Sequence, residues 1–267
     1  MLKVELHAHT ADDPVDRIPH TTRELIDRAA TLGYDAVAIT LHERQLDLAH
    51  LTPYAADRGI VLIPGTERTI EGKHVLLLNF RHGAEDVRTF ADLARLKSRA
   101  RGLVVAPHPF FPTSLCLGSD LDRYADLFDA VERNAMFTRL VDFNRRAERW
   151  AESHGKPVVG NGDVHRLVQL GTTYSLVDAP PDADAICAAV AAGRVRVESR
   201  PLAWRDVARL LSSMMLGDLW NGSRQNDEAS QPNVSAVDLS RSPRATSMRN
   251  RPGAPGTLTR QPTPTSV

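Results

Sequence analysis

Leu2-Lys3-Val4-Glu5-Leu6-His7-Ala8-His9 decides the fold, because a short and largely apolar run ends there in two histidines. The same order, an apolar run and then imidazole or carboxylate groups, recurs along the chain. Asp35–Thr40 precedes His42, Ile60–Pro64 precedes Glu67, Leu103–Pro107 precedes His108, and Pro157–Val159 precedes Asp163 and His165. Such runs are typical of buried strands, and groups at the carboxyl ends of parallel strands meet at one mouth. The sequence therefore predicts a parallel sheet or barrel whose mouth can hold metal ions.

Helical stretches separate these runs. Thr21 and Glu24 have the capping-box spacing at the start of a helix that Gly33 ends. We expect a further helical stretch at about 44–58, interrupted by Pro53, and helices at about 85–100, 120–128 and 137–153. Thr66–Ile70 and His74–Phe80 resemble two strands joined by a turn. The alternation of strands and helices favours an α/β fold.

The carboxyl-terminal part changes character. Residues 172–177 and 195–198 read as strands around a helix at 182–192, and 201–220 as a terminal helix. From 221 to 267 polar residues, proline and arginine dominate, so we expect a disordered tail. One α/β domain over residues 1–200, followed by the helix and the tail, accounts for the chain.

The composition limits the classes to which this protein can belong. Lys+Arg and Asp+Glu are equal at 33 each, so the zero net charge gives no support to binding of duplex nucleic acid. Cys116 and Cys187 are isolated, which fits a reduced, cytoplasmic protein. The first strand begins at residue 2, and no apolar run approaches the roughly 18 residues of a membrane span, so we expect neither a signal peptide nor a membrane anchor. The oligomeric state stays open.

The spacing of the polar groups indicates chelation. His7 and His9 flank Ala8 on an extended segment, so both imidazoles face one way, and Asp163 and His165 repeat this spacing. Glu67 follows a Gly-Thr pair, where a carboxylate can bridge two ions. His74 lies in an otherwise apolar strand, where an unpartnered polar group is costly. The histidines without a partnered motif read as structural: His20, His50, His82 and His154.

These motifs resemble, in order, those of the PHP (polymerase and histidinol phosphatase) family. The matching segments are Glu5–Thr10, Ala38–His42, Ile63–Glu67, His74, Ala106–Pro109 and Gly162–His165. Residues from about 160 to 200 resemble the PHP-associated region that follows the core in stand-alone members. The resemblance implies a distorted (β/α)7 TIM-like barrel with its metal site at the carboxyl-terminal ends of the strands.

The resemblance also implies two or three divalent ions, with manganese, zinc and iron all suited to these donors. His7, His9, Glu67 and Asp163 would hold the first ion, and Glu67 would bridge to a second held by His74 and His108. A third would use His42, His165 and a group from the loop after His9. We expect Asp13 to be the group from that loop, with Asp12 and His20 as alternatives. Leu41 departs from the family, which carries Asp at that position, and this removes an expected acceptor.

The implied activity is hydrolysis of a phosphate monoester of a small metabolite or nucleotide by metal-activated hydroxide, as in histidinol-phosphate or nucleoside-bisphosphate phosphatases. We expect Glu67, His42 and Asp163 to be catalytic, and Arg68 and Arg166 to contact the substrate phosphate. One alternative is an amidohydrolase-type metal hydrolase, which predicts a bridging lysine. Another is a non-catalytic metal-binding barrel.

Overall fold

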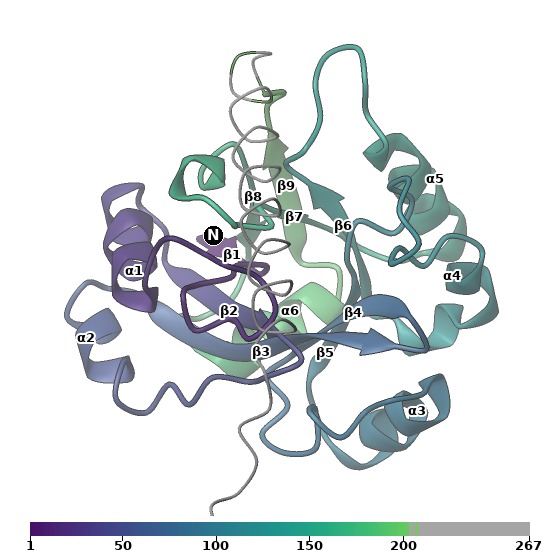
Figure 1. The fold of residues 1–267 in the computed structure, drawn as a ribbon, viewed down its shortest axis with the longest axis horizontal. Coiled ribbons are helices and arrows are strands. Elements are labelled where there is room, and N and C mark those ends of the chain that lie inside the picture. Colours follow the sequence, from purple (N-terminus) through teal and green to yellow (C-terminus); the bar gives the residue numbers. More distant parts are fainter. Residues whose placement is uncertain (203–204, 206, 208–267) are drawn as a thin grey trace, which may run out of the picture. The chain divides into compact units, whose positions relative to one another are not determined.

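Nine strands and a set of surrounding helices make up the part of the chain that the computed structural model describes, residues 1–202 together with 205 and 207. The strands are β1 Leu2–Glu5, β2 Ala36–His42, β3 Val61–Ile70, β4 Lys73–Leu78, β5 Leu103–Ala106, β6 Ala130–Asn134, β7 Val158–Asn161, β8 Thr173–Val177 and β9 Val195–Ser199. The α-helices are α1 Thr22–Thr31, α2 Thr52–Ala56, α3 Phe90–Arg99, α4 Asp120–Arg123, α5 Asn144–His154 and α6 Ala183–Ala191. In Figure 1, α1 and α2 lie on one side of the strands, α3, α4 and α5 on the other, and α6 between them.

The strands form one sheet in the order β7-β6-β5-β4-β3-β2-β1-β8-β9 that curls into a nearly closed barrel. β1, β2, β3, β5, β6, β7 and β9 run in one direction, whereas β4 and β8 run against it. The two ends of the sheet approach each other where the backbone nitrogen of Gly160 donates to Ser175 Oγ at 2.9 Å. A Cβ at position 160 would lie 2.9 Å from the carbonyl oxygen of Tyr174, so this approach requires glycine.

The barrel predicted from the sequence is therefore confirmed, and it departs from an all-parallel barrel at two reversed strands, β4 and β8. The hairpin of β3 and β4 is present as predicted. β3 is longer than expected, because it continues past Pro64 to Ile70 and carries Glu67 within it. The predicted capping box of α1 is also present, with Thr21 and Glu24 exchanging hydrogen bonds.

The predicted helices are shorter in the structure. In place of a helix from 44 to 58, only α2 forms, with proline in its first turn. The helix expected from 85 begins at Phe90, where Thr89 provides the cap, and the one expected over 120–128 splits into α4 and a 3₁₀ turn at 125–127. The stretch 137–143 is a loop because its side chains bind its own backbone: the Leu140 and Val141 amides donate to Thr138 Oγ1.

The barrel interior changes from apolar at one end to polar at the other. One apolar cluster combines inward-facing strand residues, such as Ala38 and Ile63, with Ile186 and Val190 of α6. α6 therefore closes the amino-terminal end of the parallel strands. The other end of the interior carries the polar groups, since the same alternation along β3 leads from Ile63 to Glu67.

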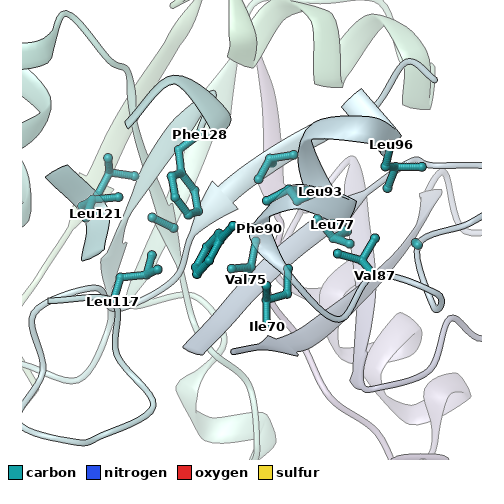
Figure 2. Packing of buried hydrophobic residues seen from close by; sticks show 14 of the residues in the cluster. Ile70, Val75, Leu77, Val87, Phe90, Leu93, Leu96, Leu117, Leu121 and Phe128 are labelled. Carbon is teal, nitrogen blue, oxygen red and sulfur yellow. The ribbon is translucent and has the colours of Figure 1, made fainter. Parts of the chain in front are cut away.

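A second apolar cluster packs the helices onto the outside of the sheet. Figure 2 shows Val75 and Leu77 of β4 beneath Phe90 and Leu93 of α3, with Phe128 from the segment before β6 beside them. All five side chains are at most 3% exposed. This packing fixes β4, and with it His74 at its start.

The predicted terminal helix at 201–220 and the predicted tail at 221–267 lie outside the described residues, apart from 201, 202, 205 and 207. In the part of the chain that is described, no helix has the length and apolar character needed to cross a bilayer.

We expect Leu77→Ala to lower the free energy of unfolding by about 2–5 kcal/mol, because Leu77 is fully buried against α3. The matched control is Leu140→Ala, which removes the same atoms from a side chain that is 81% exposed and should change stability by less than about 0.5 kcal/mol. Urea unfolding monitored by circular dichroism measures both. Equal effects of the two substitutions would contradict the packing described here.

Candidate metal centre

Glu67 lies at the centre of a cluster of histidines at the polar end of the barrel. Its Oε2 atom is 3.3 Å from His7 Nε2, 3.3 Å from His9 Nε2 and 3.2 Å from His42 Nε2. Its Oε1 atom is 2.8 Å from His74 Nδ1 and 3.2 Å from His108 Nε2. The two oxygens of one carboxylate thus face two different sets of imidazoles.

The register of the sheet explains how Glu67 reaches these groups. Glu67 pairs with His42 across β2 and β3, so both lie at the same level of the barrel. His74 is the second residue of β4 and pairs with Thr69, and the reversal of β4 places it at the polar end rather than at the amino-terminal end. His108 follows the end of β5 and has φ of 29°, an unusual value for a residue with a side chain.

The two short motifs His7-Ala8-His9 and Asp163-Val164-His165 pair with each other through their middle residues. Ala8 and Val164 form an isolated parallel bridge, with His9 N donating to Val164 O and Val164 N donating to His7 O, both at 3.1 Å. The flanking side chains therefore converge. Asp163 Oδ1 lies 3.4 Å from His7 Nε2 and 3.3 Å from His165 Nδ1.

The loop after His9 adds two carboxylates to the cluster. Asp13 Oδ2 accepts from both His9 Nδ1 at 2.9 Å and His42 Nδ1 at 3.0 Å. Asp16 Oδ2 lies 3.1 Å from His165 Nε2. Asp13 thereby directs the Nε2 atoms of two histidines toward Glu67.

Glu132 on β6 is a fully buried carboxylate that links several groups of the site. It accepts from His7 Nδ1 at 2.9 Å and from the His108 backbone nitrogen at 2.7 Å. It also accepts from Asn161 Nδ2 at 3.0 Å. Asn134, two residues along β6, donates to Asp163 Oδ2 at 3.0 Å. One strand therefore orients an imidazole, a backbone segment and a carboxylate of the cluster.

Glu5 is a second buried acid beneath the cluster. Its carboxyl accepts from the Gly162 nitrogen at 2.9 Å and from the His7 nitrogen at 3.1 Å. Burial raises the pKa of Glu5 to about 8 despite these hydrogen bonds. The contacts tie the end of β1 to the segment after β7, and so hold the two paired motifs together.

The charges in the cluster compensate one another. Burial by itself lowers the pKa of His7, but the carboxylates of Asp163, Glu132 and Glu67 outweigh it and raise that pKa well above its usual value. Burial likewise opposes ionisation of Glu67, yet the neighbouring histidines hold its pKa well below the usual range. In the protein without metal, the raised pKa of His7 favours a protonated imidazole beside these buried acids.

The same groups fit divalent metal ions. Five sets of three side chains each place their donor atoms within 4.8 Å of one another, and together they include every predicted metal-ligating residue: His7, His9, Asp13, His42, Glu67, His74, His108, Asp163 and His165. Asp163 Oδ1 is buried without a hydrogen-bond partner, as expected for an oxygen that faces a cation. Clustered imidazole and carboxylate donors suit zinc, manganese and iron.

Sequence reasoning missed two acids of the site, and it offered an aspartate and a histidine as alternatives to Asp13. Glu132 and Asp16 were not predicted, although the period-two pattern Ala130, Glu132, Asn134 places a charge inside a buried strand, which was a usable signal. Of the alternatives to Asp13, Asp12 lies near Thr22 Oγ1 at 2.9 Å, and His20 donates to the His9 carbonyl at 2.9 Å. Neither lies within the donor sets.

The expected phosphate contact of Arg68 is wrong. Arg68 is 1% exposed, and its guanidinium pairs with the Glu43 carboxylate at 2.5 Å and donates to the Val87 carbonyl at 3.0 Å. Because successive side chains of a strand alternate, Arg68 points away from the interior that Glu67 faces. Arg166 is half-buried, and its Nη1 donates to the His165 carbonyl at 2.9 Å.

Leu41 has no place in the cluster. Its side chain is fully buried among apolar residues on the outside of the sheet, including Ile39 and Leu46. His42 obtains its Nδ1 acceptor from Asp13 instead, so the departure at position 41 leaves no imidazole of the cluster without a partner.

Comparison with known proteins agrees with this architecture. The PHP-associated family matches residues 142–195. DNA polymerase III PolC-type of Streptococcus thermophilus is 42% identical over 78 residues, and that of Streptococcus pyogenes is 44% identical over 68 residues. These stretches are 29% and 26% of this chain but only 5% of each polymerase.

Two solved structures share the fold. A two-domain protein from Bacteroides vulgatus that contains a predicted PHP-like metal-dependent phosphoesterase is 17% identical, with a TM-score of 0.59 over 80% of this chain and 69% of that one. PsfC from Pseudomonas syringae is 19% identical, with a TM-score of 0.55 over 83% of this chain and 98% of that one.

We predict that Glu132→Gln weakens Mn²⁺ binding by about 10–100-fold, because the amide no longer fixes His7 with a full negative charge. The matched control is Glu152→Gln on the exposed face of α5, which should leave binding unchanged. Equilibrium dialysis with metal analysis measures both variants, and thermal unfolding checks that they are folded. Wild-type affinity in Glu132→Gln would show that Glu132 does not orient the centre.

Proposed function

We propose that this chain, which belongs to the PHP family, is a metal-dependent phosphoesterase that hydrolyses a phosphate monoester of a small metabolite or nucleotide. The observation that carries the proposal is the position of Glu67, whose two oxygens face separate sets of histidines. A carboxylate between two donor sets is suited to two ions about 3.5–4 Å apart, the spacing used in phosphate ester hydrolysis.

The donor sets suggest which residues would hold which ion. His7, His9 and Asp163 lie around Glu67 Oε2, and His74 and His108 lie at Glu67 Oε1. We assign the first set to one ion and the second set to another, bridged by Glu67. His42 and His165, with Asp13, would hold a third.

Bound divalent ions would activate water and neutralise the oxygens of the phosphoryl group. The chain's own residues keep the donors in place for that chemistry. Asp13 and Glu132 accept from the Nδ1 atoms of His9, His42 and His7, so the Nε2 atoms present lone pairs to the centre. Glu67, His42 and Asp163 are our candidates for direct contact with the reacting groups.

Arg166 is the remaining candidate for binding the substrate phosphate. It follows His165 directly and extends from the loop at the polar end of the barrel. A guanidinium can bind a phosphate through two parallel hydrogen bonds. Arg68 is buried and paired with Glu43, so it does not face the centre.

The bridging position argues against the amidohydrolase alternative, which predicted a lysine there. Glu67 occupies the position between the donor sets. Lys3, Lys73 and Lys97 instead donate to the carbonyl oxygens of Leu32, Ser114 and Leu127. The zero net charge also favours a small substrate over a duplex nucleic acid.

We expect His9→Ala to lower phosphate release by a factor on the order of 100, since it removes a group that faces both Glu67 and Asp163. The matched control is His50→Ala, which removes an exposed imidazole outside the donor sets and should retain wild-type activity. The assay is phosphate release from a panel of monoesters and diesters after reconstitution with manganese, zinc or iron.

Two outcomes would count against the proposal. If no metal supports release from any ester, the protein is not a phosphoesterase of this kind. If His9→Ala and His50→Ala behave alike, the activity does not arise at this cluster.

A further inference from the structure

The loops at the polar end of the barrel carry exposed apolar side chains. In the described part of the chain, the exposed large hydrophobic residues are Met1, Val15, Leu115, Leu140, Val141, Phe143 and Val168. All but Met1 lie in loops that follow β1, β5, β6 or β7, which are strands of the common direction. These six side chains therefore lie on the surface at the end of the barrel that bears the metal centre.

Two aromatic rings connect this surface to the centre. The ring of Phe111 lies edge-on to the imidazole of His108, with centroids 6.2 Å apart and planes at 69°. The ring of Phe143 lies 5.4 Å from that of Phe111, and its side chain is 40% exposed. His108 in turn contacts Glu67. We call Phe111 and Phe143 the aromatic shelf.

Hydrogen bonds to the centre fix both loops that carry the shelf. The Phe111 nitrogen donates to the His108 carbonyl at 3.2 Å, which keeps Phe111 beside the imidazole. Asn144, next to Phe143, accepts from the Asn134 nitrogen at 2.9 Å. The side chain of Asn134 reaches Asp163. The shelf is therefore held by the same residues that hold the donor groups, as a preformed binding site requires.

We propose that the aromatic shelf binds a planar aromatic ring in the leaving group of the substrate, next to the phosphate at the metal centre. This inference rests on the proposed phosphoesterase function. Phe111, the nearer ring of the shelf, contacts the imidazole of His108 directly. A small ester whose phosphate lies at the metal centre can therefore reach the shelf. Tilted rings such as these offer both a face and an edge to a third ring.

The test compares two substrates that differ only in the ring. 2-Phenylethyl phosphate and ethyl phosphate are both esters of primary alcohols, so they present similar chemistry to the centre. We expect kcat/KM for the aromatic ester to exceed that for ethyl phosphate by about 10-fold or more, from burial of the ring. Phe143→Ala should reduce this ratio to about 1–3, and Phe143→Leu, which keeps apolar area but no ring, should give an intermediate ratio.

Val168→Ala is the matched control, because it removes an exposed apolar side chain from another loop of the same rim. It should leave the ratio at the wild-type value. A ratio near 1 in the wild-type protein, or an equal fall in Val168→Ala and Phe143→Ala, would overturn the assignment to the shelf.

Binding without turnover separates this inference from the proposed function. Calorimetry with the manganese-loaded protein measures the affinities of 2-phenylethylphosphonate and ethylphosphonate, which resist hydrolysis. A preference for the aromatic phosphonate that Phe143→Ala abolishes would support the shelf even if no ester is hydrolysed. Hydrolysis of both esters with equal phosphonate affinities would support the phosphoesterase and reject the shelf.

Discussion

The burial of the Glu67 carboxylate among five imidazoles is the constraint on which the rest of the site depends. Glu67 is 1% exposed, and an isolated charge in such a place would be prohibitively costly. The histidines compensate for it, and they in turn need acceptors, which Asp13 and Glu132 supply. Each charged group of the centre therefore contacts a group of opposite charge. Metal cations can take the place of the protons on the imidazoles as the positive charges beside the buried acids.

The interior of the barrel changes from apolar to polar along its strands, and this makes the arrangement possible. On β3, Ile63 faces the apolar cluster under α6, and Glu67 faces the donors. Gly65 lies between them, where a Cβ would come within 2.7 Å of Leu78 and 3.0 Å of Thr40. On β6, Ala130, Glu132 and Asn134 repeat the same progression. The apolar residues pack against one another and hold the strands in register. This register fixes the positions of the polar groups along the barrel axis.

The loops at the polar end are ordered by side chains that satisfy backbone groups. Thr138 accepts from two amides of its loop, and Asn144 joins that loop to Asn134. Since Asn134 also contacts Asp163, the position of the aromatic shelf and that of the donor groups depend on one another. The donor groups and the aromatic shelf therefore share one framework of hydrogen bonds.

The sequence by itself determined the features that depend on local spacing. The apolar runs, the polar groups that end them, the hairpin and the cap at Thr21 are all set by residues a few positions apart. That is why the barrel and the set of donor residues could be predicted. Most of the donor residues could be predicted because they lie at or just after the end of an apolar run.

Only the tertiary structure decided the direction of β8, the separation of Arg68 from the site and the contributions of Glu132 and Asp16. These depend on partners far away in the chain: Glu132 lies 125 residues from His7, and Asp16 lies 149 residues from His165. Arg68 neighbours Glu67 in sequence but occupies the opposite face of the strand, where Glu43 and the Val87 carbonyl hold it. Local spacing sets which residues end each strand, but sheet closure sets which of them meet.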